Sequence, residues 1–260
     1  MQYSKHLKFY NSIVTNGLYV PENVLDFEDV VDALAISIHG LSHQHCKLAQ
    51  TNPDAYEHIL DNLEIYSQLG VPISVNMTVT PDNYTTIPAF VNKLLERYPI
   101  TSFAFNRYIP SPSVMQTDKK RFVMNIKQLN DSLVKINQAA EEHPKVLFRY
   151  AIHFPYCVVD NKDLLKYVGN CGIGQNYISV DCDGNLQMCS YSDQILGNIF
   201  TDDLRTLWNK HEILTSYRSQ DWIPDICRPC QYLSKCAAGC KMTGDKLFTP
   251  DYLLKELEKA

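Results

Sequence analysis

The segment Cys227-Arg-Pro-Cys230-Gln-Tyr-Leu-Ser-Lys-Cys236-Ala-Ala-Gly-Cys240 decides how the C-terminal third of this chain is interpreted. Two cysteines separated by two residues turn both sulfurs toward one point, which is a common start of a metal site. Two more cysteines follow at gaps of five and three residues, and the last gap holds only alanine and glycine. Such small residues let the backbone approach a bulky inorganic core. The segment therefore predicts a cysteine-ligated metal module.

The other cysteines and the overall composition support metal binding over disulfide formation. Seven of the nine cysteines lie between residues 171 and 240. Cys46 lies far from them and is expected to be an ordinary cysteine packed in the core. The chain shows no leader-like N-terminus and no apolar run of about 20 residues, so we expect a cytoplasmic protein without a membrane segment. Cytosol disfavours disulfides. The net charge of -5 argues against a nucleic-acid partner.

A predicted hairpin separates two of the upstream cysteines. Asp183-Gly184 between two alternating segments predicts a two-residue turn, which pairs Cys182 with Asn185 and Cys189 with Ile178. The two sulfurs then lie roughly 13 Å apart along the strands. Because ligands of one cluster cannot be that distant, we expect Cys182 to be a small apolar filler and not a partner of Cys189. Cys157 stays unassigned.

Strand-like and helix-like segments alternate in the first half of the chain. We expect strands at residues 12–14, 33–38, 71–79, 101–105 and 146–152, and helices from about 53 to the cap at Gly70, at 87–98 and at 121–142. Such alternation predicts an α/β fold with a parallel sheet, and the missing doubly-wound glycine fingerprint favours part of a (β/α) barrel. The pattern changes near residue 155. We therefore expect a partial barrel at residues 1–155 and a small cysteine-rich α+β domain at 156–260.

The cysteine spacing alone leaves two types of metal centre possible. A structural zinc ion takes four ligands, commonly from two C-x2-C pairs, and this stretch holds one such pair. The spread of the cysteines favours iron–sulfur clusters, with a zinc module as the alternative.

The cysteine spacing resembles that of the SPASM domain of radical S-adenosylmethionine (SAM) enzymes. The family pattern of a cysteine, a glycine, a cysteine and then C-x2-C-x5-C-x3-C falls here on Cys171, Gly184, Cys189, Cys227, Cys230, Cys236 and Cys240. The match covers roughly residues 155–260. It implies auxiliary [4Fe-4S] clusters, one or two, held by two sets of three cysteines: Cys227, Cys230 and Cys236, and Cys171, Cys189 and Cys240. The fourth ligand of the second set would be Cys182, Cys157, an oxygen ligand or none.

The first half resembles the later part of a radical SAM partial barrel. Thr15-Asn16-Gly17 and Ile36-Ser37-Ile38-His39-Gly40 are similar to turns and strand ends of that family. The resemblance implies cofactor-binding positions at the ends of strands, namely Ser37, Asn76, Asn106 and Arg107, although capping and turn roles explain these residues equally well. Barrel enzymes also place active residues at such ends, where His39, His43 and His45 occur, but we expect a solvated loop there. Trp208 and Trp222 are expected to pack the cysteine-rich module.

Two departures from the family shape the functional interpretation. The C-x3-C-x2-C motif of the SAM-cleaving cluster and the glycine-rich segment that holds SAM are absent, and both would precede Ser12. We expect the chain to begin near the third barrel strand, either as a truncated piece or with a separate chain that completes the barrel. The second departure is that no cysteine follows Cys240, where the family has a final one.

The resemblance implies a role in peptide or protein modification. Intact members cleave SAM to a radical that abstracts hydrogen from a peptide or protein substrate, while auxiliary clusters transfer electrons or anchor the substrate. SAM is expected to bind only if the missing N-terminal part is supplied, so enzymatic activity of this chain alone is not predicted and no catalytic residue is assigned. The alternative is a non-catalytic, degenerate relative that binds clusters or a peptide for a partner.

Overall fold

The computed structural model describes residues 1–109, 118–243 and 248–257, and the chain divides into two compact units. The first unit comprises Met1–Tyr108, Arg121–Ala151 and Asn161–Val168, and the second comprises Ile109–Lys120, Ile152–Asp160 and Gly169–Ala260. The boundary expected near residue 155 falls inside a short segment of the second unit, and the chain enters the first unit once more at Asn161–Val168.

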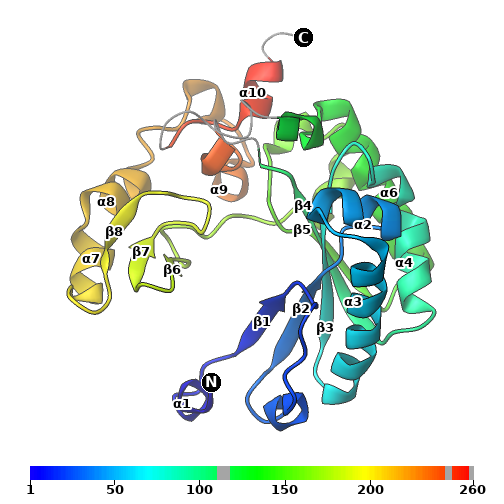
Figure 1. Cartoon of the computed structure of the whole chain (residues 1–260). Coiled ribbons are helices and arrows are strands. Elements are labelled where there is room, and N and C mark those ends of the chain that lie inside the picture. The colour runs from blue at the N-terminus through cyan, green and yellow to red at the C-terminus, as the bar shows by residue number, and fades with distance from the viewer. Residues whose placement is uncertain (110–117, 244–247, 258–260) are drawn as a thin grey trace. The chain divides into compact units, whose positions relative to one another are not determined.

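A five-stranded parallel sheet forms the framework of the first unit (Figure 1). Its strands follow one another in chain order: β1 (Ser12–Thr15), β2 (Ala33–Ser37), β3 (Ile73–Val79), β4 (Ile100–Arg107) and β5 (Leu147–Tyr150). The helices are α1 (Gln2–His6), α2 (Ser42–Ala49), α3 (Pro53–Tyr66), α4 (Ile87–Leu95) and α6 (Ile126–Glu142), with 3-10 turns at Val24–Phe27, Ser67–Leu69, Tyr84–Thr86 and Lys162–Tyr167. Parallel strands joined in sequence through helices are the arrangement of a (β/α) barrel segment, which confirms the predicted fold class.

Side-chain caps set where two of these helices begin. Asn52 accepts a hydrogen bond from the Ala55 N–H at 2.8 Å, and α3 starts directly after it. Asn125 and Gln128 form a reciprocal capping box at the start of α6. The helix predicted from residue 121 therefore begins only at Ile126, and Asp118–Phe122 forms a separate 3-10 turn.

The two faces of the sheet carry side chains of different size. On one face Phe103 stacks with Phe148 at a centroid distance of 5.6 Å and meets Phe90 of α4 edge-on at 6.2 Å. The opposite face carries the short side chains Ala35, Ser74 and Asn76, with the longer Leu147 and Arg149 at its β5 edge. These residues help to line a cavity of about 460 Å³. The core of this unit thus lies between the sheet and its helices, while the other face is hollow.

The second unit combines a small antiparallel sheet with short helices. Its strands are β6 (Ser179–Val180), β7 (Asn185–Gln187) and β8 (Ile195–Asn198), and its helices are α7 (Leu204–Lys210), α8 (Glu212–Ser219), α9 (Leu233–Cys236) and α10 (Tyr252–Leu257). Single 3-10 turns lie at Tyr156–Val158, Asp225–Cys227 and Lys241–Thr243. Both predicted cysteine-rich segments lie in this unit.

The hairpin turn between β6 and β7 differs from the predicted two-residue turn. The strand register is shifted by one residue, so residues 182–184 form a three-residue turn. The Asp181 carboxylate holds this turn by accepting the Asn185 N–H at 2.9 Å, and Gly184 closes it with a φ of +81°. Cys182 lies in the turn and is exposed, so its predicted role as an apolar filler is wrong.

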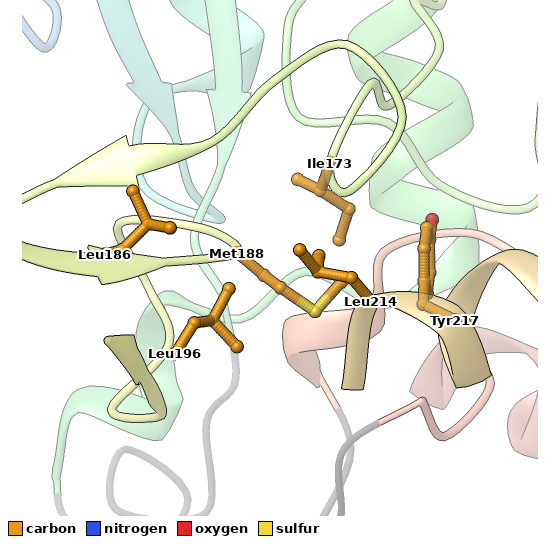
Figure 2. Close-up of a cluster of buried hydrophobic side chains, with 6 residues drawn as sticks. All are labelled: Ile173, Leu186, Met188, Leu196, Leu214 and Tyr217. Atoms are coloured by element: carbon orange, nitrogen blue, oxygen red, sulfur yellow. The ribbon is translucent and has the colours of Figure 1, made fainter. Parts of the chain in front are cut away.

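A buried apolar cluster forms the core of the second unit (Figure 2). Its members come from the loop after Cys171, from β7 and the residue that follows it, from β8 and from α8. They are Ile173, Leu186, Met188, Leu196, Leu214 and Tyr217. Trp208 and Trp222 pack against this cluster, as predicted. The Trp222 indole N–H donates to the Tyr217 carbonyl at 2.9 Å, and the Arg218 guanidinium lies over the Trp208 ring at 4.5 Å. Cys171 and Cys189 also contact this apolar cluster, so the core of the second unit holds two of the predicted metal ligands in place.

No helix within the described part of the chain is long and apolar enough to cross a membrane.

Candidate metal centre

The C-x2-C pair lies on a run of tight turns. Cys227 ends the 3-10 turn that follows Pro224, and its N–H donates to the Pro224 carbonyl at 2.9 Å. The Cys230 N–H donates to the Cys227 carbonyl at 3.1 Å, and the Leu233 N–H continues to the Cys230 carbonyl at 3.0 Å. These successive turns lead into α9, which ends at the buried Cys236. Three cysteines of the segment are thus linked by short, hydrogen-bonded backbone.

The loop between Cys236 and Cys240 has an uncommon backbone. Ala237, Ala238 and Gly239 have φ values of +42°, +59° and +80°, all in the left-handed region. A Cβ atom at Gly239 would lie 2.6 Å from the Asp251 Cβ and 2.7 Å from a Pro155 carbon atom, so only glycine fits. At Gly239 the small residue serves a close approach of the backbone to protein atoms, while the predicted approach to an inorganic core stays a prediction.

Hydrogen bonds secure both ends of this loop. The Asp251 carboxylate accepts the Cys240 N–H at 2.9 Å, and the Asp251 N–H donates to the Ala238 carbonyl at 3.1 Å. At the other end, the Tyr156 N–H points at the Cys236 sulfur at 3.3 Å, and a His153 ring nitrogen lies 3.2 Å from the Cys236 carbonyl. Hydrogen bonds to cysteine sulfur are one of the means by which a protein sets the reduction potential of a bound cluster.

Cys171 interacts electrostatically with Cys189 and shares a neighbouring tyrosine with Cys240, and we call these three cysteines the first group. Burial raises the pKa of the Cys171 thiol, and a negative charge on Cys189 raises it further. Burial raises the pKa of the Tyr217 hydroxyl as well, and charges on Cys171 and Cys240 act in the same direction. Thiolates of residues from both ends of the cysteine-rich stretch therefore act on one buried tyrosine, shown in Figure 2.

Cys227, Cys230 and Cys236 form a second group. Burial raises the pKa of the Cys227 thiol, and negative charges on Cys236 and Cys230 raise it further. Mutual repulsion of thiolates is expected wherever cysteines converge, and a bound metal centre removes it by taking up the negative charge. The assignment of all six cysteines to two ligand sets stays a prediction of the family resemblance.

Lys241 was not singled out by the sequence, yet it lies close to both groups. Its side chain is only 2% exposed. Burial lowers the pKa of its ammonium group, while negative charges on Cys171, Cys240, Cys236 and Asp251 act in the opposite direction. A single lysine after a cysteine carries no sequence signal, because its position relative to the distant Cys171 depends on the folded chain.

A thiol set of this kind fits an iron–sulfur cluster by its chemistry. Each iron of such a cluster takes one cysteine thiolate, so the ligands lie around a core of several atoms instead of converging on one ion. Among the residues that the structure describes, no group of three or more His, Cys, Asp or Glu side chains has the arrangement needed for a single metal ion.

The polar residues predicted at the ends of the barrel strands lie on two faces. Ser37 pairs with Asn76, and Asn106 pairs with Thr78, which shares a face with Asn76. Ser37, Asn76 and Asn106 are therefore on the hollow face of the sheet. Arg107, as the next residue of β4, lies on the helix-covered face and is buried at 2% exposure. The four residues are thus not brought together at one site.

The histidines of the first unit do not form the expected solvated loop. His39 and His45 stack at a centroid distance of 5.5 Å, and His45 is buried. His45 Nδ1 accepts the His39 N–H at 3.1 Å, and His39 Nδ1 accepts the Thr78 N–H at 3.1 Å. Burial, together with the charge of His45, lowers the pKa of His39 to about 4. Of His39, His43 and His45, only His43 is exposed, on α2.

Known proteins resemble the chain in sequence. Residues 171–231 match the family model of SPASM, an iron–sulfur cluster-binding domain. The AdoMet-dependent heme synthase of Nitratidesulfovibrio vulgaris is 22% identical over 233 residues, which are 84% of this chain and 63% of that protein. The PqqA peptide cyclase of Gluconobacter oxydans is 22% identical over 258 residues, or 92% of this chain and 66% of the cyclase. The chain thus spans just under two thirds of these relatives.

Solved structures share the fold. A structure of anSMEcpe with bound AdoMet has a TM-score of 0.72 at 16% identity and covers 98% of this chain and 70% of that chain. The structure of Streptococcus suis SuiB bound to S-adenosylmethionine has a TM-score of 0.68 at 17% identity and covers 91% of this chain and 56% of that one. The chain is thus a relative of the radical SAM enzymes, with a SPASM domain at residues 171–231.

Proposed function

We propose that the second unit binds two [4Fe-4S] clusters, one at Cys171, Cys189 and Cys240 and the other at Cys227, Cys230 and Cys236. The observation that carries this proposal is that Cys171 and Cys240 act on the same buried tyrosine although the chain between them is long. Cys171 also interacts with Cys189, and Cys227 interacts with Cys230 and Cys236. The SPASM match at residues 171–231 supports it.

The surroundings of the thiols support a cluster in each group. The Tyr156 N–H is aimed at the Cys236 sulfur, the left-handed loop before Cys240 keeps bulky side chains away, and Cys171 and Cys189 are fixed to the apolar core. Bound clusters of this kind supply one-electron transfer. Each group provides three cysteines, so one iron of each cluster keeps a position for a ligand that is not among the six.

We further propose that the protein to which this chain belongs acts on a peptide or protein substrate. Support comes from the PqqA peptide cyclase among the relatives and from a SuiB structure bound to the precursor peptide SuiA, which covers 91% of this chain with a TM-score of 0.63. This sequence contains no C-x3-C-x2-C motif, so the SAM chemistry of the intact enzymes requires those cysteines from residues beyond this sequence. The cluster-binding unit would then transfer electrons or hold the substrate.

Metal analysis of the full chain tests the proposal. After anaerobic reconstitution with iron and sulfide we expect about eight iron and eight sulfide ions per chain, with negligible zinc. A colourless protein with one or two zinc ions after expression in zinc- and iron-replete medium, and no iron uptake afterwards, would show that the zinc alternative is correct.

A pair of variants in the same hairpin region gives the matched comparison. Cys189→Ala removes a half-buried member of the first group, while Cys182→Ala removes an exposed cysteine of the hairpin turn. We expect Cys189→Ala to lower the iron content and Cys182→Ala to leave it unchanged. Equal loss in both variants would refute the assignment of the first group.

A further inference from the structure

Lys241 is the most deeply buried cation in the described part of the second unit. It begins the 3-10 turn Lys241–Thr243 directly after Cys240 and is 2% exposed. Its ammonium group donates hydrogen bonds to the carbonyl oxygens of Ala237 and Gly239 and lies 4.9 Å from the centroid of the Trp222 ring. A buried ammonium group is costly unless hydrogen bonds and opposite charges compensate it.

The negative groups around Lys241 belong to both cysteine groups. Cys171 and Cys240 of the first group act on it, and so does Cys236 of the second. The charge of Lys241 in turn lowers the pKa of Cys227, which is the first cysteine of the C-x2-C pair. Asp251 is the one carboxylate among these partners, and its oxygen atoms already accept the N–H groups of Cys240 and Leu253. One carboxylate balances one ammonium group, so thiolates bound to clusters would add negative charge beyond what Lys241 neutralises.

We propose that Lys241 is a positioning residue for both clusters: it fastens the Cys236–Cys240 loop through its hydrogen bonds and, through its charge, favours the reduced form of each cluster. The inference rests on the proposed function, because it presupposes clusters at these six cysteines. A cluster ligated by thiolates carries a net negative charge that grows by one on reduction, and this net charge is one determinant of its potential. A cation in a buried environment of low dielectric constant stabilises the more negative form more strongly than it would in water.

The two parts of this role can be separated by substitution. Lys241→Gln keeps two N–H donors for the carbonyl oxygens but removes the charge, whereas Lys241→Met removes both, and Lys241→Arg keeps the charge. Lys235→Gln is the matched control, because Lys235 is adjacent to Cys236 in sequence but exposed, and water screens an exposed charge.

The test is a dithionite titration of the anaerobically reconstituted full chain, with each cluster followed by electron paramagnetic resonance. In Lys241→Gln we expect normal iron content and an equilibrium constant for reduction at least tenfold smaller, which is 59 mV lower for one electron. Lys241→Arg and Lys235→Gln are expected to stay near the wild-type potential. In Lys241→Met we expect reduced iron content as well, because the loop loses its hydrogen bonds.

The outcomes separate the failure of this inference from that of the proposed function. If the wild-type chain binds no iron, the proposed function is wrong. If the wild type binds iron and Lys241→Gln has an unchanged potential, the charge has no such role and the inference is wrong. If neither neutral variant binds iron but Lys241→Arg does, the charge is needed for cluster assembly instead of for the potential, and the inference is wrong. If Lys241→Arg also fails to bind iron, the site needs the shape of lysine only, and the inference is overturned.

Discussion

Replacement of Gly239 by alanine tests whether the loop between Cys236 and Cys240 is as tightly constrained as the structure indicates. An alanine there adopts a φ of +80°, which costs about 1–2 kcal/mol relative to glycine. Its Cβ also meets the Asp251 Cβ at 2.6 Å and a Pro155 ring carbon at 2.7 Å, so the packed surroundings must move, at a further cost of about 1–3 kcal/mol. We therefore expect a total loss of about 2–5 kcal/mol, together with weaker iron binding, because Asp251 holds Cys240.

Gly184→Ala is the matched control, since Gly184 has a φ of +81° in the same unit. The Cβ of that alanine meets the ring of Phe200, which is 78% exposed and can rotate away, and the Asn198 Oδ1 at 3.2 Å, which needs to shift by only a few tenths of an ångström. Only the backbone cost of about 1–2 kcal/mol is then expected. Both tryptophans of the chain lie in the second unit, so urea unfolding followed by tryptophan fluorescence reports on the two variants alike. Equal losses of stability, or normal iron content in Gly239→Ala, would refute the reasoning.

Two further predictions concern the two cores. Because His39 is neutral in the folded chain with a pKa of about 4, against 6.5 ordinarily, the folded state binds fewer protons than the unfolded one, and stability falls as the pH drops from 6.5 toward 4. The loss of folding free energy approaches about 3 kcal/mol, from a pKa difference of roughly 2.5 at 1.36 kcal/mol for each unit. Urea unfolding midpoints measured at pH 7 and pH 4.5 should show a smaller loss in His39→Gln than in the wild type. An identical loss in both proteins would contradict the prediction. Leu214→Ala in the core of Figure 2 should destabilise the second unit by about 2–5 kcal/mol, while Leu204→Ala, at a half-exposed position, should cost under about 0.5 kcal/mol in the same urea titration.

The sheet and the helices α3, α4 and α6 of the first unit were predictable because their signals are local, whereas α1 and α2 were not predicted. Buried Tyr56, Leu60 and Leu63 follow the helical period of α3, and all five strands occur close to their predicted places. The start of α6 was missed, since the decisive signal is the reciprocal bonding of Asn125 and Gln128 and not the apolar pattern around it.

The features that were not predicted depend on specific side-chain contacts, some of them local and some between distant residues. The hairpin register is set by the Asp181 carboxylate, which outweighs the preference of Asp183-Gly184 for a two-residue turn. The stacking of His39 with His45 was hidden because a polar stretch after a strand is usually a loop. Spacing and resemblance suggested which cysteines belong together, but the burial of Lys241 between them appears only in the folded chain.

The central claim is that the six cysteines form two separate cluster sites. The most direct test is Mössbauer spectroscopy of the full chain reconstituted with iron-57, comparing the wild type with Cys227→Ala, which alters the second group alone. We predict two [4Fe-4S] signals in the wild type, and in the variant a [4Fe-4S] signal from the first group that keeps about half of the iron. Retention of all the iron as [4Fe-4S], or complete loss of it in the variant, would contradict the account.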